Sequence, residues 1–269
     1  MEKVTSADGT KIAFEAVGTG PTVILVGGAF CDHNATTALA EALALNFTAV
    51  SYDRRGRGES GDQLPYAVER EVEDIAALIA HFGATAHLHG ISSGGALCLK
   101  AAATLPIESV SVLEPPYRVD PSAPAVPKGY TDTIIELTST NRRGEAVAYF
   151  MTKAVGQPQE AVEAAKTQPM WPALEAMAHT LAYDAHVMGG DESLLPTEFL
   201  TGLDVRILGL YSTASPPWMA AGAEAIAKTA PNASVQGLAG TFHEVPAETL
   251  APVLTAFYRG AAATPEIPA

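Results

Sequence analysis

The sequence predicts an α/β domain with a mostly parallel central sheet, helices on both faces of that sheet and a helical insertion. Short β-rich segments alternate with helical periodicity through the first half of the chain, and this order is typical of parallel strands joined by crossover helices. The strand signal disappears at about residue 117 and returns after residue 198. The chain has 269 residues, 48% of them hydrophobic, which is enough to bury one full core.

The expected strands and helices follow from local patterns. The N-terminal segment 1–18 leads from a polar start into strands, and later strands are expected at 22–28, 47–53, 85–90, 109–116, 204–212 and 233–240. Apolar residues at 68, 72, 75, 79 and 82 are spaced by four, three, four and three residues. This spacing predicts an amphipathic helix between Pro65 and Phe82, ended by Gly83. A final helix is expected between Pro246 and Arg259.

These elements divide the chain into a core and one insertion. We expect the core to comprise residues 1–116 and 199–260, and a helical cap to comprise residues 117–198, which begins with the proline-rich segment PSAPAVPKG. The last residues, 261–269, are expected to form a frayed tail.

Composition limits the partners and the compartment. Sixteen Lys and Arg residues against 30 Asp and Glu residues give a net charge of −14, which disfavours nucleic acid and anionic membranes as partners. The N-terminus lacks an apolar signal segment, and two cysteines, Cys31 and Cys98, are too few for a disulfide framework. We therefore expect a cytoplasmic protein without a metal or other cofactor. A monomer and a homodimer both remain open.

A serine lies at the centre of a tight turn. The segment GISSG at 90–94 lies between a buried strand and an alanine-rich helix, the context in which G-x-S-x-G holds an exposed nucleophile. Small residues at both ends of the motif let the strand and the helix approach closely. Ser92 is therefore the candidate nucleophile. The alternative is a turn that only connects the two elements.

Three further segments carry a resemblance to the α/β-hydrolase family. VGGAF at 26–30 resembles the loop that supplies an oxyanion donor, and YDRRGRGES at 52–60 resembles the D-x-R-G-x-G-x-S segment. GTFH at 240–243 resembles the family's histidine loop. The resemblance covers nearly the whole chain and implies an α/β-hydrolase fold with a cap inserted in it.

The resemblance also implies the base and the oxyanion donors. A serine hydroxyl needs a neighbouring base to accept its proton during attack, and histidine suits this task near neutral pH. Of the seven histidines, His243 follows the last strand and is expected to lie over Ser92. The backbone N–H groups of Ala29 and Ser93 are the expected oxyanion donors.

The acid of the triad is not at its usual place. Many family members have an aspartate in the loop after the strand at 205–211, where this chain has Ser215. Glu114 ends the preceding core strand at the same edge of the sheet, and the order Ser92, Glu114, His243 keeps the order serine, acid, histidine. This placement resembles zearalenone-type lactone hydrolases. The alternative for Glu114 is a carboxylate that caps a helix or pairs with an arginine.

The expected reaction is cofactor-free hydrolysis of a carboxylic ester or lactone through an acyl-enzyme. The substrate is expected to be small and uncharged, because the candidate wall residues are apolar: Phe30, Met151, Trp171, Tyr183, Met188 and Trp218. The resemblance to lactone hydrolases extends to QPMW at 168–171 in the cap. Two alternatives remain: a ligand-binding protein of the same fold, or an enzyme of C–C cleavage or rearrangement.

Overall fold

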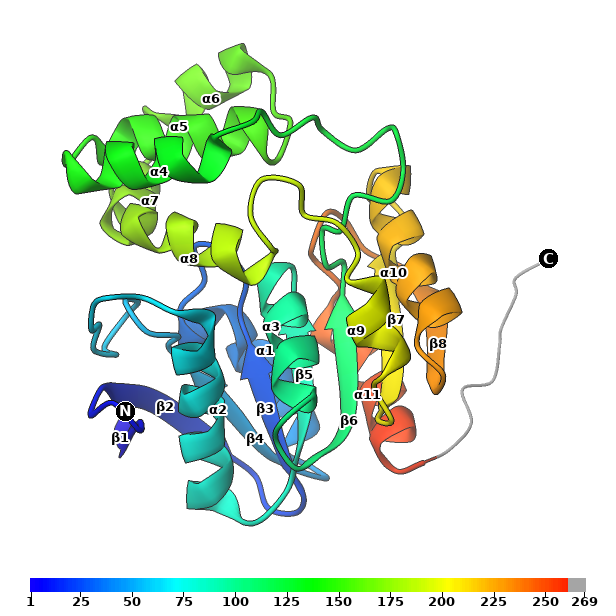
Figure 1. Cartoon of the computed structure of the whole chain (residues 1–269). Helices are drawn as coiled ribbons and strands as arrows, with labels where there is room; N and C mark the ends of the chain where they lie inside the picture. Colours follow the sequence, from blue (N-terminus) through cyan, green and yellow to red (C-terminus); the bar gives the residue numbers. More distant parts are fainter. Residues whose placement is uncertain (261–269) are drawn as a thin grey trace.

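The computed structural model describes residues 1–260, and the predicted tail at 261–269 lies outside the described residues. Within residues 1–260 the chain forms an eight-stranded sheet with the strand order β1-β2-β4-β3-β5-β6-β7-β8 (Figure 1). The strands are β1 (Glu2–Thr5), β2 (Lys11–Val17), β3 (Thr22–Val26), β4 (Thr48–Tyr52), β5 (Ala86–Ile91), β6 (Ile107–Leu113), β7 (Arg206–Ser212) and β8 (Ala233–Leu238). The expected α/β-hydrolase fold, with its mostly parallel sheet, is confirmed.

The sheet is antiparallel at one edge and parallel elsewhere. β1 pairs with β2 and β2 pairs with β4 in antiparallel register, whereas β4, β3, β5, β6, β7 and β8 pair in parallel. The tight turn between β1 and β2 uses Gly9 at φ 90°, a conformation that glycine adopts without steric cost. The parallel strands all have their carboxyl ends at one edge of the sheet, where ligands bind in open α/β sheets.

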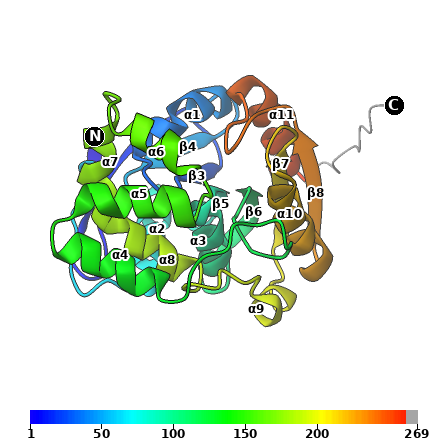
Figure 2. The same ribbon diagram turned by 90° about the horizontal axis from the view of Figure 1, so that it is seen from above.

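Helices cover both faces of the sheet, as Figure 2 shows from above. On one face lie α2 (Val68–Phe82), α3 (Ser93–Ala102) and α10 (Pro217–Thr229), and on the other lie α1 (Thr37–Leu43) and α11 (Ala247–Tyr258). Because both faces of the sheet are covered, successive side chains of a central strand must pack alternately on the two faces, as strand β3 shows. Ile24 and Val26 pack in the cluster with α2 and α3, whereas Val23 and Leu25 pack in the cluster with α1 and α11. Because β3 is buried on both faces, all of its residues after Thr22 are apolar.

A group of helices lies above the carboxyl ends of the strands (Figure 1). They are α4 (Tyr130–Ser139), α5 (Arg143–Lys153), α6 (Gln159–Ala165), α7 (Trp171–Met177) and α8 (Leu181–Val187), with a short 3-10 turn before α8 at Ala178–Thr180. These helices share their own hydrophobic cluster, which includes Ile134, Val147 and Leu181. The short helix α9 (Thr197–Thr201) returns to the core, where Leu200 packs in the cluster of α2 and α3. Below, α4–α8 are called the cap helices.

Two predicted boundaries differ clearly from the structure, one of them because of proline. Strand β6 ends at Leu113, not at 116, because Glu114 has φ 50° and the next two residues, Pro115 and Pro116, lack the N–H that a strand donates. Helix α2 begins at Val68, three residues after the predicted start at Pro65.

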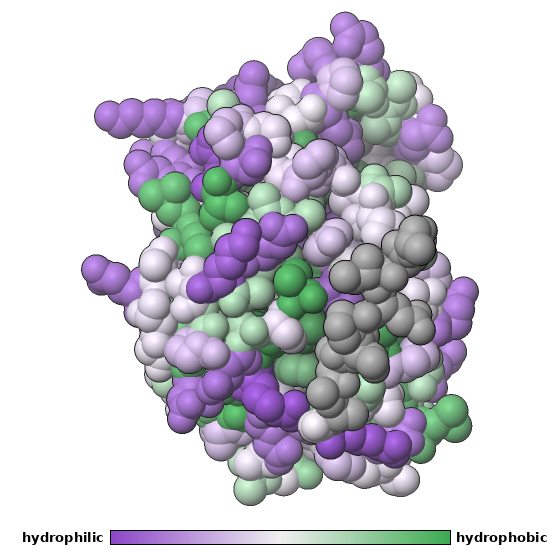
Figure 3. Space-filling model, turned by 90° about the vertical axis from the view of Figure 1, so that its right-hand side faces the viewer, coloured by the Kyte–Doolittle hydropathy of each residue, from purple (hydrophilic) through white to green (hydrophobic). Residues whose placement is uncertain are grey.

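The face that carries β8 and α10 shows hydrophilic residues interspersed with smaller hydrophobic areas (Figure 3). None of the helices in residues 1–260 combines the length and the apolar character that crossing a bilayer requires.

Candidate active site

Ser92 occupies a sharp turn between β5 and α3. Its backbone has φ 57° and ψ −126°, a strained conformation for a residue with a side chain, and its N–H donates to the Leu113 carbonyl at 2.9 Å. The motif's glycines are needed because of close backbone contacts. A Cβ at Gly90 would collide with the Gly94 carbonyl, and a Cβ at Gly94 would collide with the Val26 carbonyl. The turn therefore fixes the Ser92 side chain at the carboxyl edge of the sheet.

Glu114 and His243 meet at this edge. Oε2 of Glu114 lies 2.9 Å from Nδ1 of the His243 ring, and the backbone N–H of His243 donates to the same oxygen at 2.8 Å. The Glu114 side chain is fully buried, whereas that of His243 is 23% exposed. A buried carboxylate at this distance stabilises a positive charge on the ring.

The other Glu114 oxygen is held by the loop that follows β7. Ser212 donates to Oε1 from its backbone N–H at 2.8 Å and from its hydroxyl at 2.7 Å. The Ser215 hydroxyl lies 2.7 Å from that of Ser212. Burial raises the pKa of Glu114, but His243, Ser212 and Ser215 outweigh burial and bring this pKa to about 2. The loop without an aspartate thus supplies donors that keep Glu114 ionised.

Ser92 and His243 line the same cavity. Within residues 1–260 no hydrogen bond joins the Ser92 hydroxyl to the His243 ring, so these two residues share a cavity without direct contact of this kind. Glu114, in contrast, contacts His243 directly.

The two expected oxyanion donors also belong to this cavity. Ala29 and Ser93 both line it, and Gly28 approaches the turn so closely that a Cβ there would lie 3.0 Å from the Ser92 Cβ. Phe30 follows at φ 59°, in the left-handed region, so the chain bends away directly after Ala29. The backbone segments that contain Ala29 and Ser93 therefore both border the cavity next to Ser92.

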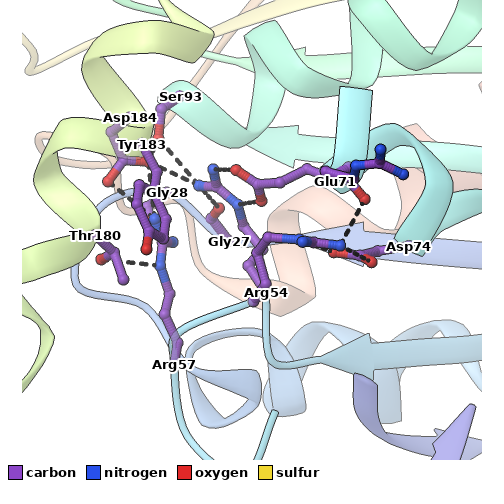
Figure 4. Close-up of polar contacts among 12 residues, drawn as sticks. Gly27, Gly28, Arg54, Arg57, Glu71, Asp74, Ser93, Thr180, Tyr183 and Asp184 are labelled. Carbon is purple, nitrogen blue, oxygen red and sulfur yellow. Dashed lines mark hydrogen bonds and ion pairs between the residues drawn. The ribbon is translucent and has the colours of Figure 1, made fainter. Parts of the chain in front are cut away.

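A buried ionic cluster connects this edge of the sheet to the cap helices (Figure 4). Arg54 binds Glu71 through two N–H groups, each at 2.7 Å, and donates to Asp184 of α8 at 2.8 Å. Arg57 donates to both oxygens of Asp184 at 2.9 Å. The Ser93 hydroxyl donates to Asp184 at 2.7 Å. Below, Arg54, Arg57, Glu71 and Asp184 are called the ionic cluster.

The charges of the ionic cluster cancel. Two guanidinium groups face two carboxylates, and all four side chains are at most 6% exposed. Burial raises the pKa of Asp184, but Arg57, Arg54 and the Ser93 hydroxyl outweigh burial and hold this pKa below its ordinary value. Arg57 also donates to the Gly28 carbonyl at 2.5 Å, and Arg54 donates to the Gly27 carbonyl at 3.3 Å. The cluster thus ties α8 to the loop that precedes Ala29.

The cavity lies between the edge of the sheet and the cap helices. The space between its walls is about 740 Å³, which includes open solvent at its mouth. Apolar wall residues come from the cap and from α10: Val126, Phe150, Leu181, Met188 and Trp218. Charged side chains in the lining are those of Arg118 and Asp184.

Two of the six predicted wall residues, Met188 and Trp218, line this cavity, and four do not: Phe30, Met151, Trp171 and Tyr183. Tyr183 stacks on Tyr66 with ring centroids 3.9 Å apart, and its hydroxyl donates to Asp62. The Trp171 indole donates to Glu175 within the cap. Met151 packs in the cap cluster, and Phe30 packs edge-on against Phe150, which itself lines the cavity.

Sequence reasoning did not single out Arg118, Phe150 or Asp184. For Asp184 a signal existed: three arginines in the turn at 54–57, directly after a buried strand, require buried acidic partners, although their spacing does not say which acids these are. Within residues 1–260 no group of three or more His, Cys, Asp or Glu side chains is placed to hold a metal ion.

Comparison with known proteins identifies the family. Residues 23–254 match the alpha/beta hydrolase family. The chain belongs to the alpha/beta hydrolase family. This hydrolase is similar to an alpha/beta hydrolase of Sphaerobacter thermophilus, with 47% identity, a TM-score of 0.89 and coverage of 96% of this chain and 100% of the other.

More distant similarities agree with this fold. A thermophilic esterase of Thermogutta terrifontis, solved with malate bound, is 23% identical, with a TM-score of 0.74 and coverage of 96% of this hydrolase and 98% of the esterase. The uncharacterized hydrolase YraK of Bacillus subtilis is 34% identical over 111 residues. That match spans 40% of this chain and 41% of YraK.

Proposed function

We propose that this protein is a serine hydrolase of carboxylic esters or lactones, with Ser92 as nucleophile, His243 as general base and Glu114 as the acid of the triad. The observation that carries the proposal is the contact of a fully buried Glu114 with the ring of His243, 2.9 Å apart, in a loop that shares the cavity of Ser92. The similarity to the esterase of Thermogutta terrifontis supports ester hydrolysis as the reaction class.

In the first half of the reaction His243 accepts the Ser92 proton as the hydroxyl oxygen attacks the ester carbonyl carbon. The ring becomes positively charged, and Glu114, ionised because its pKa is about 2, stabilises this charge and orients the ring. The N–H groups of Ala29 and Ser93 bind the oxyanion.

Collapse of this intermediate breaks the bond to the alcohol oxygen, which takes the proton from His243 and leaves an acyl group on Ser92. Water then attacks the acyl carbon while His243 accepts a proton from it, and the second collapse returns this proton to Ser92 and releases the acid. In a lactone the alcohol stays attached to the acyl group, so one hydroxy acid is released.

The proposed reaction requires a hydrogen bond from the Ser92 hydroxyl to the His243 ring. We expect this bond to form when substrate binds, because catalytic hydrogen bonds often tighten only in the substrate complex. The neutral ionic cluster and the apolar walls shield the reacting atoms from water, which strengthens the electrostatic contribution of Glu114 and the oxyanion donors.

Labelling with a fluorophosphonate tests the proposal. We expect the wild-type protein to be labelled once, at Ser92, and to hydrolyse 4-nitrophenyl esters, and Ser92→Ala to lose both properties. Ser139→Ala is the matched control, because the Ser139 hydroxyl lies on α4 and donates to a carbonyl of its own helix. Labelling at another residue, or ester turnover that survives Ser92→Ala, would refute the assignment.

A further inference from the structure

Arg118 is a cavity residue whose guanidinium lacks a partner within residues 1–260. Its Nε is buried and has no hydrogen-bond partner there. The other arginine side chains are all engaged: they form ion pairs at Arg54, Arg55, Arg57, Arg70 and Arg142, and they donate to oxygen atoms at Arg143, Arg206 and Arg259. Among the described arginines, Arg118 is therefore the one available to a ligand.

The backbone of Arg118 is fixed where the chain enters and leaves the cap. Its N–H donates at 2.9 Å to the carbonyl of Ser193, which lies on the returning segment and also lines the cavity. The preceding residue, Tyr117, is 2% exposed and packs in the core with α2 and α3. A guanidinium on such a fixed segment loses little backbone freedom when it binds a ligand.

The other charged residues around the cavity do not neutralise the Arg118 guanidinium. The other charged lining residue, Asp184, has its carboxylate bound by Arg54 and Arg57 in the neutral ionic cluster. Glu114 lies behind the His243 ring and is not part of the lining. The positive charge of Arg118 therefore has no counter-charge in the lining, and a partly buried cation of this kind is stabilised by an anionic ligand.

We propose that the substrate of this hydrolase carries a carboxylate that pairs with Arg118 while its ester or lactone carbonyl lies at Ser92. This inference rests on the proposed function and replaces the expectation of an uncharged substrate. The planar guanidinium matches a carboxylate in a two-bond geometry, and the apolar walls accommodate the carbon skeleton between the two ends. The net charge of −14 disfavours more highly charged anions such as phosphates.

A matched pair of substrates tests the pairing. The monoanion 4-nitrophenyl hydrogen glutarate and the neutral 4-nitrophenyl pentanoate have acyl chains of equal carbon number. We expect Arg118→Gln to lower kcat/KM for the glutarate ester about 10-fold or more, the effect of losing a hydrogen bond between charged groups. The pentanoate ester should change little. Arg142→Gln removes the same charge from an exposed ion pair of the cap and should affect neither ester.

A binding measurement keeps this inference separate from the hydrolytic proposal. The 4-nitroanilides of glutarate and pentanoate are amides of the same shape, and calorimetric titration in the Ser92→Ala background measures their affinity without turnover. We expect Arg118→Gln to weaken the glutarate anilide about 10-fold or more, and Arg118→Lys to weaken it less because the charge remains.

The outcomes of the two experiments are distinct. Equal effects of Arg118→Gln on both anilides would overturn the carboxylate assignment, whatever the enzyme hydrolyses. If the wild-type protein turned over neither ester, the proposed function would fail, and the titration would still decide whether Arg118 binds a carboxylate.

Discussion

Asp184→Asn is the substitution that probes the ionic cluster most directly. The Asp184 carboxylate accepts from Arg54 at 2.8 Å, from Arg57 at 2.9 Å through both oxygens and from the Ser93 hydroxyl at 2.7 Å. Asparagine has nearly the same size but no charge. In the variant two buried guanidinium groups would face one carboxylate, that of Glu71, so one positive charge would be buried without compensation.

The size of the effect follows from this charge count. Removing one partner of a buried ion pair costs about 3–5 kcal/mol, because the remaining charge stays desolvated. This is a large part of the 5–15 kcal/mol that typically separates folded from unfolded proteins. At roughly 2–4 °C per kcal/mol for a chain of this size, we expect the melting midpoint to fall by about 6–20 °C.

Differential scanning calorimetry of Asp184→Asn measures this change, with urea unfolding as a second measurement. Glu145→Gln is the matched control, since it also neutralises a carboxylate paired with arginine, but at a pair in which Glu145 is 62% and Arg142 45% exposed. Its melting midpoint should stay that of the wild type, because exposed pairs contribute little. A midpoint for Asp184→Asn equal to that of this control would refute the reasoning.

We also expect Asp184→Asn to change how the melting midpoint depends on pH. The pKa of Asp184 in the folded protein lies below its ordinary value of 3.8, so its stabilising contribution is fully present above about pH 4 and is lost as the pH falls through the lower folded value. The gap in melting midpoint between wild type and Asp184→Asn should therefore be constant near neutral pH and narrow below pH 4. A gap that widens on acidification would contradict the ionised state of Asp184.

Two other substitutions test the site. Glu114→Gln keeps the shape of the side chain but removes the charge next to His243. We expect kcat for a 4-nitrophenyl ester to fall by about 10⁴-fold, with an unchanged circular dichroism spectrum. A near-normal kcat would exclude Glu114 from the triad. Gly94→Ala places a Cβ 2.6 Å from the Gly27 carbonyl, so soluble yield and fluorophosphonate labelling should both fall, whereas Gly202→Ala, with its nearest atom at 3.5 Å, should behave as wild type. Equal behaviour of the two glycine variants would contradict the close packing of the turn.

The α/β class could be predicted from the sequence because the parallel strands and helix α2 carry local signals, whereas the α/β-hydrolase fold itself was implied by the resemblance of four segments to that family. Parallel strands buried on both faces are short apolar runs, and the crossover helix α2 has regular apolar spacing, so both could be recognised without tertiary information. The same logic placed Glu114 next to His243. Glu114 directly follows β6, and His243 lies in the loop after β8. The carboxyl ends of these parallel strands lie at one edge of the sheet, and the structure brings the two side chains to 2.9 Å.

The wall of the cavity could not be predicted in the same way. Met151 and Phe150 are neighbours on α5, and a rotation of about 100° between them decides which one lines the cavity. That rotation depends on how the cap helices pack on one another. Asp184 lies 130 residues after Arg54 along the chain, so no spacing rule could pair them.

The ionic cluster contacts the proposed oxyanion site through a single peptide unit, the one between Gly28 and Ala29. Arg57 donates at 2.5 Å to the carbonyl of Gly28, and the same planar peptide carries the N–H of Ala29. A guanidinium on the carbonyl oxygen fixes the direction of this N–H and polarises it, so that it becomes a stronger donor to an oxyanion. Because Arg57 is itself held by Asp184, a cap helix and the donor loop stabilise each other's position.

This connection predicts an effect of Asp184→Asn on the reaction as well as on stability. At temperatures well below the melting midpoint of the variant, kcat should fall while KM changes little, because a misdirected Ala29 N–H weakens binding of the oxyanion more than binding of the neutral ester. Loss of a single oxyanion donor costs about 10²–10³-fold in kcat, which sets the upper limit for a donor that is only misaligned. If the fully folded variant kept the kcat of the wild type, the ionic cluster would stabilise the fold without positioning the donor loop.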